Sequence, residues 1–361
     1  MMPTGPVPTT ARPASGDPAP SGVLAEETGR TVLTVRGLTT ELRVEGGPIR
    51  AVEDVSFDLR VGETLGIVGE SGCGKSMTAL SIMGLLPRPI GKIVAGSIML
   101  EDVGDLAQLS EARMKAVRGD DVSMIFQEPM TSLNPVFTVG FQICEAIQAH
   151  RPVRGVVARA KAIDMLELVG IPLPELRFNS YPHQLSGGMR QRVMIAMALA
   201  CEPKIMLADE PTTALDVTIQ AQILNLMNRL KRETGTSIVL ITHDLGVIAK
   251  MAQRVLVMYA GVVVEDAAVR DLFARPLHPY TVGLLKSMPS ANRRTGPKQR
   301  LHTIPGVVPS LNALPRGCRY SDRCPDVHDR CRQTEPPLAA PDSTGDAQAA
   351  RKVRCWLHCK T

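Results

Sequence analysis

The segment Gly69–Ser76 has residue types and spacing that could hold a polyphosphate. It matches the pattern G-x-x-x-x-G-K-[ST] at every fixed position. In such a loop the glycines let backbone N–H groups surround phosphate oxygens, and the N-terminus of the following helix adds positive potential. Lys75 would reach the β- and γ-phosphates, and Ser76 would ligate Mg²⁺. A glycine-rich turn that binds nothing is the alternative. We predict an ATP site formed by Gly69, Glu70, Ser71, Gly72, Cys73, Gly74, Lys75 and Ser76.

Two adjacent acids follow an apolar segment and would complete such a site. Asp209 and Glu210 come directly after Ile205–Ala208, which reads as a buried strand. Phosphate chemistry needs a carboxylate near the metal ion and, for hydrolysis, a group that activates water near the γ-phosphate. We expect Asp209 to serve Mg²⁺ and Glu210 to polarise the attacking water. A solvated turn at the end of a strand is the alternative.

A third segment, Leu185–Arg192, begins a helix with a hydroxyl and two glycines. Ser186, Gly187 and Gly188 would cap this helix, whose N-terminus also suits phosphate. A capped helix without a ligand is the alternative. With these three motifs in this order, the chain resembles the ATPases of ABC transporters, whose signature loop has this Leu-Ser-Gly-Gly sequence.

The resemblance implies roles for further positions. Gln127 matches the glutamine that senses Mg²⁺ and links the core to a helical subdomain. The segment Thr213–Asp216 matches the D-loop, and His243 matches the switch histidine that contacts the γ-phosphate. Outside this family order, a surface glutamine and a structural histidine are the usual interpretations.

The family assembles as pairs, so the resemblance implies a partner. Two ATPase domains would sandwich two ATP molecules, with Ser186, Gly187 and Gly188 acting across the pair and Asp216 of the D-loop contributing to nucleotide binding. Closure on ATP and opening after hydrolysis would drive transport. Since the chain has one phosphate loop, it must pair with a second ATPase subunit, which the resemblance implies is similar but not identical.

The elements that would position these residues follow an α/β pattern. Short β-rich segments alternate with helical patterns from Thr31 onward, as is typical of a largely parallel sheet. Thr64–Val68 predicts a buried strand leading into the phosphate loop, and Lys75–Leu86 predicts the helix after it. Further strands are expected at Val32–Val35, Ala51–Leu59, Val122–Phe126 and Ser237–Thr242, with helices within Val139–Gly170 and at Ile219–Arg232.

Composition divides the chain into three parts. Residues 1–30 are rich in Pro, Ala, Gly and Thr and lack the regions of a signal peptide, so we expect a disordered tail. Residues 31–270 would form a P-loop NTPase core of the ABC ATPase type, with an antiparallel β subdomain and a helical subdomain at about 128–190. The chain after about Asp266 reads as loop-like. Residues 271–361 would form a C-terminal extension that contains a cluster of cysteines.

Three segments sharpen the resemblance toward importers of dipeptides and oligopeptides. Glu128–Pro135 is similar to the segment that follows their glutamine, and His278–Leu285 is similar to their extension; either alone could be a proline-rich turn. The third is a cysteine-rich tail. The resemblance implies ATP hydrolysis that energises peptide import. An importer of nickel or another small solute is one alternative, because such importers share this ATPase type. A soluble ATPase acting on nucleic acid and a subunit that binds ATP without hydrolysing it are two further alternatives.

The tail carries four cysteines with the spacing C-x5-C-x6-C-x23-C: Cys318, Cys324, Cys331 and Cys355. Four thiolates suit either a [4Fe–4S] cluster or tetrahedral zinc. The similar tail of the peptide importers carries an iron–sulfur cluster, so the resemblance favours iron–sulfur. Disulfides or free thiols are the alternatives, and Cys359 could substitute for Cys355.

Charge and hydropathy argue against a nucleic-acid partner and against a membrane-spanning helix in this chain. The net charge is +5 from 41 basic and 36 acidic residues, with no basic block among aromatics, so we expect no nucleic acid. No stretch of about 20 uncharged apolar residues could span a bilayer. The resemblance implies a peripheral location at the cytoplasmic face of the membrane, two integral membrane permease subunits and an extracytoplasmic substrate-binding protein.

Thr39–Ile49 lacks the aromatic residue on which family members usually stack adenine; Leu42 or Arg43 occupies that region.

Overall fold

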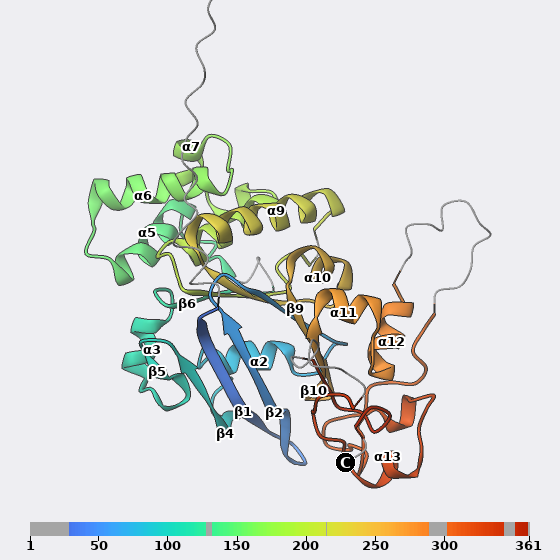
Figure 1. Ribbon diagram of the computed structural model, residues 1–361. Coiled ribbons are helices and arrows are strands. Elements are labelled where there is room, and N and C mark those ends of the chain that lie inside the picture. Colours follow the sequence, from blue (N-terminus) through green and yellow to red (C-terminus); the bar gives the residue numbers. More distant parts are fainter. Residues whose placement is uncertain (1–28, 128–131, 214, 289–301, 343–350, 360–361) are drawn as a thin grey trace, which may run out of the picture.

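The computed structural model describes residues 29–127, 132–213, 215–288, 302–342 and 351–359. Two sheets and the helices around them make up this part of the chain (Figure 1). The expected tail up to residue 28, residues 128–131 of the expected glutamine loop and Ala214 of the expected D-loop lie outside the described residues.

The elements alternate between strands and helices along most of the chain. The strands are β1 (Thr31–Val44), β2 (Gly47–Arg60), β3 (Thr64–Val68), β4 (Gly91–Leu100), β5 (Gly104–Asp105), β6 (Val122–Ile125), β7 (Ile205–Asp209), β8 (Ser237–Ile241), β9 (Arg254–Tyr259), β10 (Val262–Ala268) and β11 (Lys352–Val353). The α-helices are α2 (Lys75–Ile82), α3 (Glu111–Val117), α5 (Val139–His150), α6 (Gly155–Leu168), α7 (Pro174–Phe178), α8 (Gly187–Leu199), α9 (Val217–Thr234), α10 (Leu245–Met251), α11 (Val269–Ala274), α12 (Pro279–Lys286) and α13 (Asp329–Gln333).

The larger sheet brings the ends of several buried strands to one edge. Its order is β11-β10-β9-β3-β8-β7-β6, and the strands from β9 to β6 are parallel. β10 and β11 run antiparallel to their neighbours. Because the carboxyl ends of parallel strands meet at the same edge, this order gathers the residues that follow β3, β6, β7 and β8. Those residues are the phosphate loop, Gln127, Glu210 and His243.

Alternate side chains of the parallel strands enter two different cores. In β7, Ile205 and Leu207 belong to a core shared with α2 and the smaller sheet. Met206 and Ala208 point the other way, into the core shared with α8, α9 and α10. Burial on both faces explains why β3, β7 and β8 read as continuous apolar segments instead of alternating ones.

The smaller sheet is antiparallel and lies over one face of the larger one. Its order is β2-β1-β4-β5. Leu33 of β1 and Leu59 of β2 share a core with Leu65 of β3 and Ile82 of α2. The helix that follows the phosphate loop is thus fixed between the two sheets, as Figure 1 shows.

Helices α5, α6 and α7 gather at one end of the molecule (Figure 1), and α8 packs against α5 and α6. Ile143 of α5, Leu166 of α6 and Val193 of α8 are fully buried. They belong to the same core as Met206 and Ala208 of β7. Within the described ranges, no helix has both the length and the apolar character needed to cross a membrane.

Strand predictions near the phosphate loop are confirmed most closely. β3 spans Thr64–Val68 as predicted, while β1 and β2 extend well beyond the predicted segments. The helix predicted over Lys75–Leu86 ends earlier, at Ile82. Gly84, which adopts φ +62°, takes the left-handed conformation that commonly ends a helix.

The prediction of loop-like chain after Asp266 is wrong. β10 continues to Ala268, and α11 and α12 follow. Pro279 occupies the first turn of α12, and the His278 ring accepts a hydrogen bond of 3.1 Å from the Tyr280 N–H. Proline at this position favours a helix start, so the proline that suggested a turn in fact begins a helix.

Candidate nucleotide site

Two glycines let the phosphate loop pack tightly against neighbouring backbone. A Cβ on Gly69 would lie 2.2 Å from the Met258 carbonyl oxygen, and one on Gly74 would lie 2.6 Å from that of Ala51. Both glycines have positive φ, +156° and +103°. A larger residue would push the loop off β9 or β2, so glycine here fixes where the phosphate-binding backbone lies.

Lys75 is held at the centre of this loop. Its Nζ donates to the carbonyl oxygens of Gly69 at 2.8 Å and Glu70 at 3.1 Å, and the residue is 6% exposed. Burying an ammonium group is costly without acceptors. Phosphate oxygens would offer Lys75 stronger, anionic acceptors than these two carbonyls.

Asp209 offers a buried carboxylate oxygen that hydrogen bonds among the described residues do not occupy. The residue is 4% exposed, and within the described chain its Oδ1 has no hydrogen-bond partner. Burial raises the pKa of Asp209, which a hydrogen bond with Ser76 and the charge of Lys75 partly oppose. A carboxylate beside a hydroxyl is a donor set that Mg²⁺ uses, so these residues fit the ion.

Glu210 lies at the centre of a polar cluster formed by three strand ends. Its Oε2 accepts from Gln127 Nε2 at 3.2 Å and Thr213 Oγ1 at 2.8 Å, and its Oε1 lies 3.1 Å from His243 Nδ1. Burial raises the pKa of Glu210, but hydrogen bonds with His243 and Thr213 outweigh this and leave the pKa below its usual value. The side chain is therefore a carboxylate at neutral pH. Thr213, which the sequence analysis assigned to the D-loop, is a direct partner of this carboxylate.

The backbone of Glu210 is strained in a way that aims its side chain. Its φ is +47°, in the left-handed region that residues other than glycine seldom adopt. The Glu210 N–H donates to Ile241 O at 2.9 Å, and its carbonyl accepts from the Thr213 N–H at 3.1 Å. Strain of this kind persists where surrounding contacts enforce it, and it is common at functional sites.

The signature residues lie outside this cluster. Ser186 is exposed and caps α8, accepting from the Met189 N–H at 3.3 Å. Gly188 lets α8 pack on α9, since a Cβ there would lie 2.8 Å from Ile219 Cγ2. Gly187 and Asp216 are exposed. One chain thus assembles the phosphate loop and the ends of β6, β7 and β8, and leaves the signature loop on its surface.

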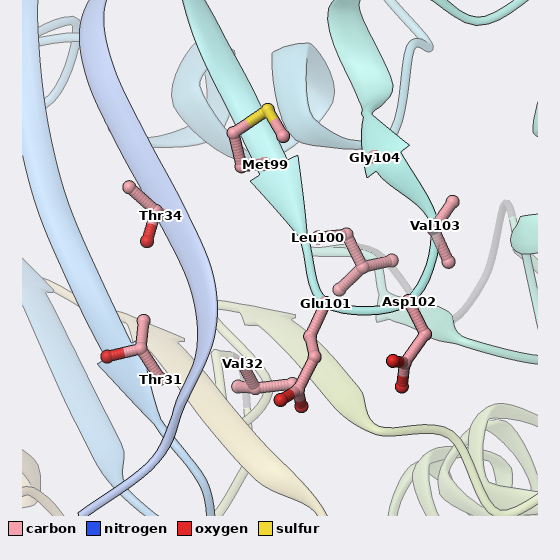
Figure 2. A pocket seen from close by; sticks show the side chains of 9 residues that line it. All are labelled: Thr31, Val32, Thr34, Met99, Leu100, Glu101, Asp102, Val103 and Gly104. Atoms are coloured by element: carbon pink, nitrogen blue, oxygen red, sulfur yellow. The ribbon is translucent and has the colours of Figure 1, made fainter.

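A hollow at the far edge of the smaller sheet is not part of this site. Figure 2 shows it between β1, the end of β4 and the turn to β5. Its two carboxylates are already paired, Glu101 with Arg30 at 3.4 Å and Asp102 with Lys204 at 3.3 Å. This hollow offers no group for phosphate chemistry.

The expected metal-binding tail is not supported. Cys318, Cys324, Cys331 and Cys355 line one pocket, yet the described chain contains no group of three or more His, Cys, Asp or Glu arranged to hold a metal ion. Burial raises the pKa of Cys318 to about 11 and that of Cys355 to about 12. These two thiols are therefore protonated at neutral pH when no metal is bound, and metal ligation would release their protons. Cys359 packs away from this pocket, with its Sγ 3.4 Å from Val353 O.

Comparison with known proteins decides the family. The family described as "ABC transporter" matches residues 52–213, and that described as "Oligopeptide/dipeptide transporter, C-terminal region" matches residues 264–331. The oligopeptide transport ATP-binding protein AppD of Bacillus subtilis is 52% identical over 328 residues, covering 91% of this chain and 97% of AppD. This chain belongs to the ATP-binding subunits of ABC transporters.

Other relatives of this ATP-binding subunit agree. The dipeptide transport ATP-binding protein DppD of Haemophilus influenzae is 48% identical over 324 residues, covering 90% of this chain and 94% of DppD. An ATP-binding cassette solved as a dimer in a post-hydrolysis state with ADP and Pi superimposes with a TM-score of 0.58 at 30% identity, covering 66% of this chain and 99% of that structure. The subunit is therefore an ATPase with the ABC cassette fold, acting on ATP with Mg²⁺.

Proposed function

We propose that this ATP-binding subunit hydrolyses ATP to energise the import of peptides across the cytoplasmic membrane. The observation that carries the proposal is the joining of an ATPase core to a C-terminal region of the oligopeptide and dipeptide transporter type in one chain. The names of AppD and DppD, which align over nearly their whole length, support the same substrate class.

The chemistry at the site divides among its own residues. Lys75 would neutralise the phosphates as it exchanges the Gly69 and Glu70 carbonyls for phosphate oxygens. Ser76 and Asp209 would hold Mg²⁺, which offsets charge on the β- and γ-phosphates when bound. The Glu210 carboxylate would accept a hydrogen bond from the attacking water and orient it toward the γ-phosphate.

Gln127 and His243 would keep Glu210 in position, since each lies within hydrogen-bond distance of one of its two carboxylate oxygens. His243 would also be free to turn toward the γ-phosphate, because its side chain is 63% exposed. ATP would therefore draw His243 toward the γ-phosphate, while Gln127 would remain at the other carboxylate oxygen of Glu210.

The exposed signature loop supports a paired arrangement. Ser186, Gly187 and Gly188 open α8, where the first N–H groups of a helix have no intrahelical acceptor, and they lie outside the cluster around Glu210. In the pair they would bind the phosphates held by a second ATPase subunit, a similar but non-identical chain.

An apolar groove supports docking of a permease helix. Leu85, Met124, Phe126, Leu133 and Met197 line it, and Leu85 and Phe126 are 37% and 39% exposed. Amphipathic helices bind grooves of this kind. Phe126 directly precedes Gln127, so a helix seated in the groove would lie next to the site it controls. The subunit would act at the cytoplasmic face of the membrane, as a peripheral partner of two permeases and an extracytoplasmic binding protein.

We also propose that the pocket of four cysteines is where an iron–sulfur cluster or zinc would bind, which the convergence of Cys318, Cys324, Cys331 and Cys355 supports. No step of ATP hydrolysis depends on this assignment. Anaerobic purification with iron, sulfide and zinc analysis tests it. About four iron and four sulfide per chain would establish a cluster, and a chain lacking all three would show that the thiols only pack.

The test of the main function is uptake by membrane vesicles that contain the assembled transporter. We expect ATP-dependent accumulation of labelled di- and oligopeptides that Lys75→Ala abolishes. Accumulation of Ni²⁺ instead, with no peptide uptake, would refute the peptide assignment and leave the ATPase assignment standing.

A further inference from the structure

The phosphate loop is tied to a distant part of the chain through Glu70. Arg323 lies in the C-terminal extension, by which we mean the described residues from 269 onward. Its Nη1 donates to one carboxylate oxygen of Glu70 at 2.7 Å and its Nη2 to the other at 3.1 Å. Two parallel hydrogen bonds between a guanidinium and a carboxylate form the most directional ion pair available to side chains.

Arg323 is itself rigidly held. Its side chain is 4% exposed, and its Nε donates to Pro305 O at 2.9 Å. Its guanidinium carbon lies 5.8 Å from the Tyr259 ring centre and 6.0 Å from that of Tyr320. A buried guanidinium fixed on three sides can set the position of the carboxylate it meets.

The extension also holds the backbone of Glu70. The Glu70 N–H donates to Tyr280 Oη at 2.8 Å. Tyr280 is fully buried and packs between Tyr259 and Tyr320, with ring centres 4.7 and 5.5 Å away. Since Glu70 is fixed through both its amide and its carboxylate, it cannot shift without moving the extension.

The contacts that fix Glu70 also reach Lys75, the residue expected to bind phosphate. The Glu70 carbonyl is one of the two acceptors of Lys75 Nζ, at 3.1 Å. The carboxylate of Glu70 is also a negative charge in a loop built for anions, and Arg323 neutralises it. Losing the arginine would therefore both loosen the loop and leave a charge that repels ATP.

We propose that Arg323 is a positioning residue for the phosphate loop and that the docked extension thereby sets the affinity of this subunit for nucleotide. Arg323 does not touch the reacting atoms. The proposal depends on ATP binding by the family and not on which solute is transported.

The matched control is Arg319, a second buried arginine that joins the extension to the core. Its side chain is 6% exposed, and it donates to Ala260 O at 2.6 Å and to Glu53 and Glu335. In the described chain its hydrogen bonds do not reach the phosphate loop. Arg319→Gln therefore weakens the docking of the extension without removing the contact with Glu70.

The experiment measures the dissociation constant of the fluorescent nucleotide MANT-ADP with Mg²⁺ for the full chain. We expect Arg323→Gln to weaken binding about tenfold or more, the loss that one charge-assisted hydrogen bond represents, and Arg319→Gln to change it less than about twofold on the same scale. Arg323→Lys, which keeps the charge but not the fork, should fall between. In the assembled transporter Arg323→Gln should raise KM for ATP more than it lowers kcat.

A double-mutant cycle with Glu70→Gln decides whether the ion pair carries the effect. Arg323→Gln should change affinity much less in the Glu70→Gln background than in the wild type, because the partner is already gone. Equal losses for Arg319→Gln and Arg323→Gln, additive effects in the cycle, or unchanged affinity of Arg323→Gln would each overturn the proposal. If Arg323→Gln does not fold, Arg323→Lys and Glu70→Gln provide the same comparison.

Discussion

Replacing Glu210 with Gln should stop ATP hydrolysis while leaving ATP binding intact. The change removes the negative charge that would orient water and keeps the shape of the side chain. A positioned acid or base contributes about 10²–10⁴-fold to a rate, equivalent to about 3–5 kcal/mol of activation free energy. We therefore expect kcat to fall at least about a hundredfold.

The surrounding hydrogen bonds predict that the variant folds. Glu210 accepts from Gln127 and Thr213 at one oxygen and faces His243 Nδ1 at the other. A glutamine can keep its carbonyl oxygen toward Gln127 and Thr213 and turn its amide toward His243, which then accepts at Nδ1 and carries its proton on Nε2. The free energy of unfolding should change by only about 1 kcal/mol.

Single-turnover phosphate release by the assembled transporter, together with MANT-ATP binding, measures both effects. Glu101→Gln, at the hollow of the smaller sheet and paired with Arg30, is the matched control and should behave as wild type. Hydrolysis by Glu210→Gln above about a tenth of the wild-type rate would contradict the assignment of Glu210, since a general base contributes more than that. Loss of MANT-ATP binding would instead show that the carboxylate is needed to build the site.

Three further outcomes test other parts of the site. Asp209→Asn should raise the Mg²⁺ concentration needed for half-maximal hydrolysis about tenfold or more. Burial raises the pKa of Asp209, whereas hydrogen bonds lower the pKa of Glu210, so Asp209 takes up a proton first as the pH falls. Mg²⁺ affinity should therefore fall before the Glu210 carboxylate is protonated, which Mg²⁺ titrations at stepwise lower pH measure. Gly187→Asp should leave MANT-ADP binding by the isolated chain unchanged but reduce hydrolysis in the assembled complex at least about tenfold. Loss of binding in the isolated chain would place the signature loop in the chain's own site. Leu85→Asp should prevent co-purification with the permeases, because it puts a charge into the apolar groove, while nucleotide binding stays at wild-type strength; unchanged co-purification would place the permeases elsewhere.

The parts of the fold that the sequence predicted well are those in which a local pattern has one structural solution. Thr64–Val68 is apolar on both faces and runs into a glycine-rich loop, and β3 has those bounds. The strand ends after β6, β7 and β8 could be expected to meet, because a parallel sheet gathers its carboxyl ends. The structure accordingly brings Gln127, Glu210 and His243 together.

Contacts between distant segments could not be predicted in this way. Thr213 reaches Glu210 only because the chain turns after a left-handed residue, and no periodicity marks that turn. The Glu70–Arg323 pair joins positions 253 residues apart and carries no short-range signal in either segment. The cysteine spacing of the tail is a local pattern, whereas metal ligation depends on how the thiols are arranged in space, so the metal site predicted there is not supported by the described residues.

That separation of 253 residues also has a consequence during synthesis. At about 5–20 residues per second, a ribosome makes Arg323 roughly 10–50 s after Glu70. During that interval the nascent chain can form β3 and α2, yet the Glu70 carboxylate lacks its arginine partner. The entropic cost of closing a loop rises only slowly with its length, so the long separation adds little to the free energy of forming the Glu70–Arg323 pair once the extension emerges. Under this proposal tight nucleotide binding is acquired last, and a chain terminated before Arg323 would bind nucleotide more weakly than the full chain.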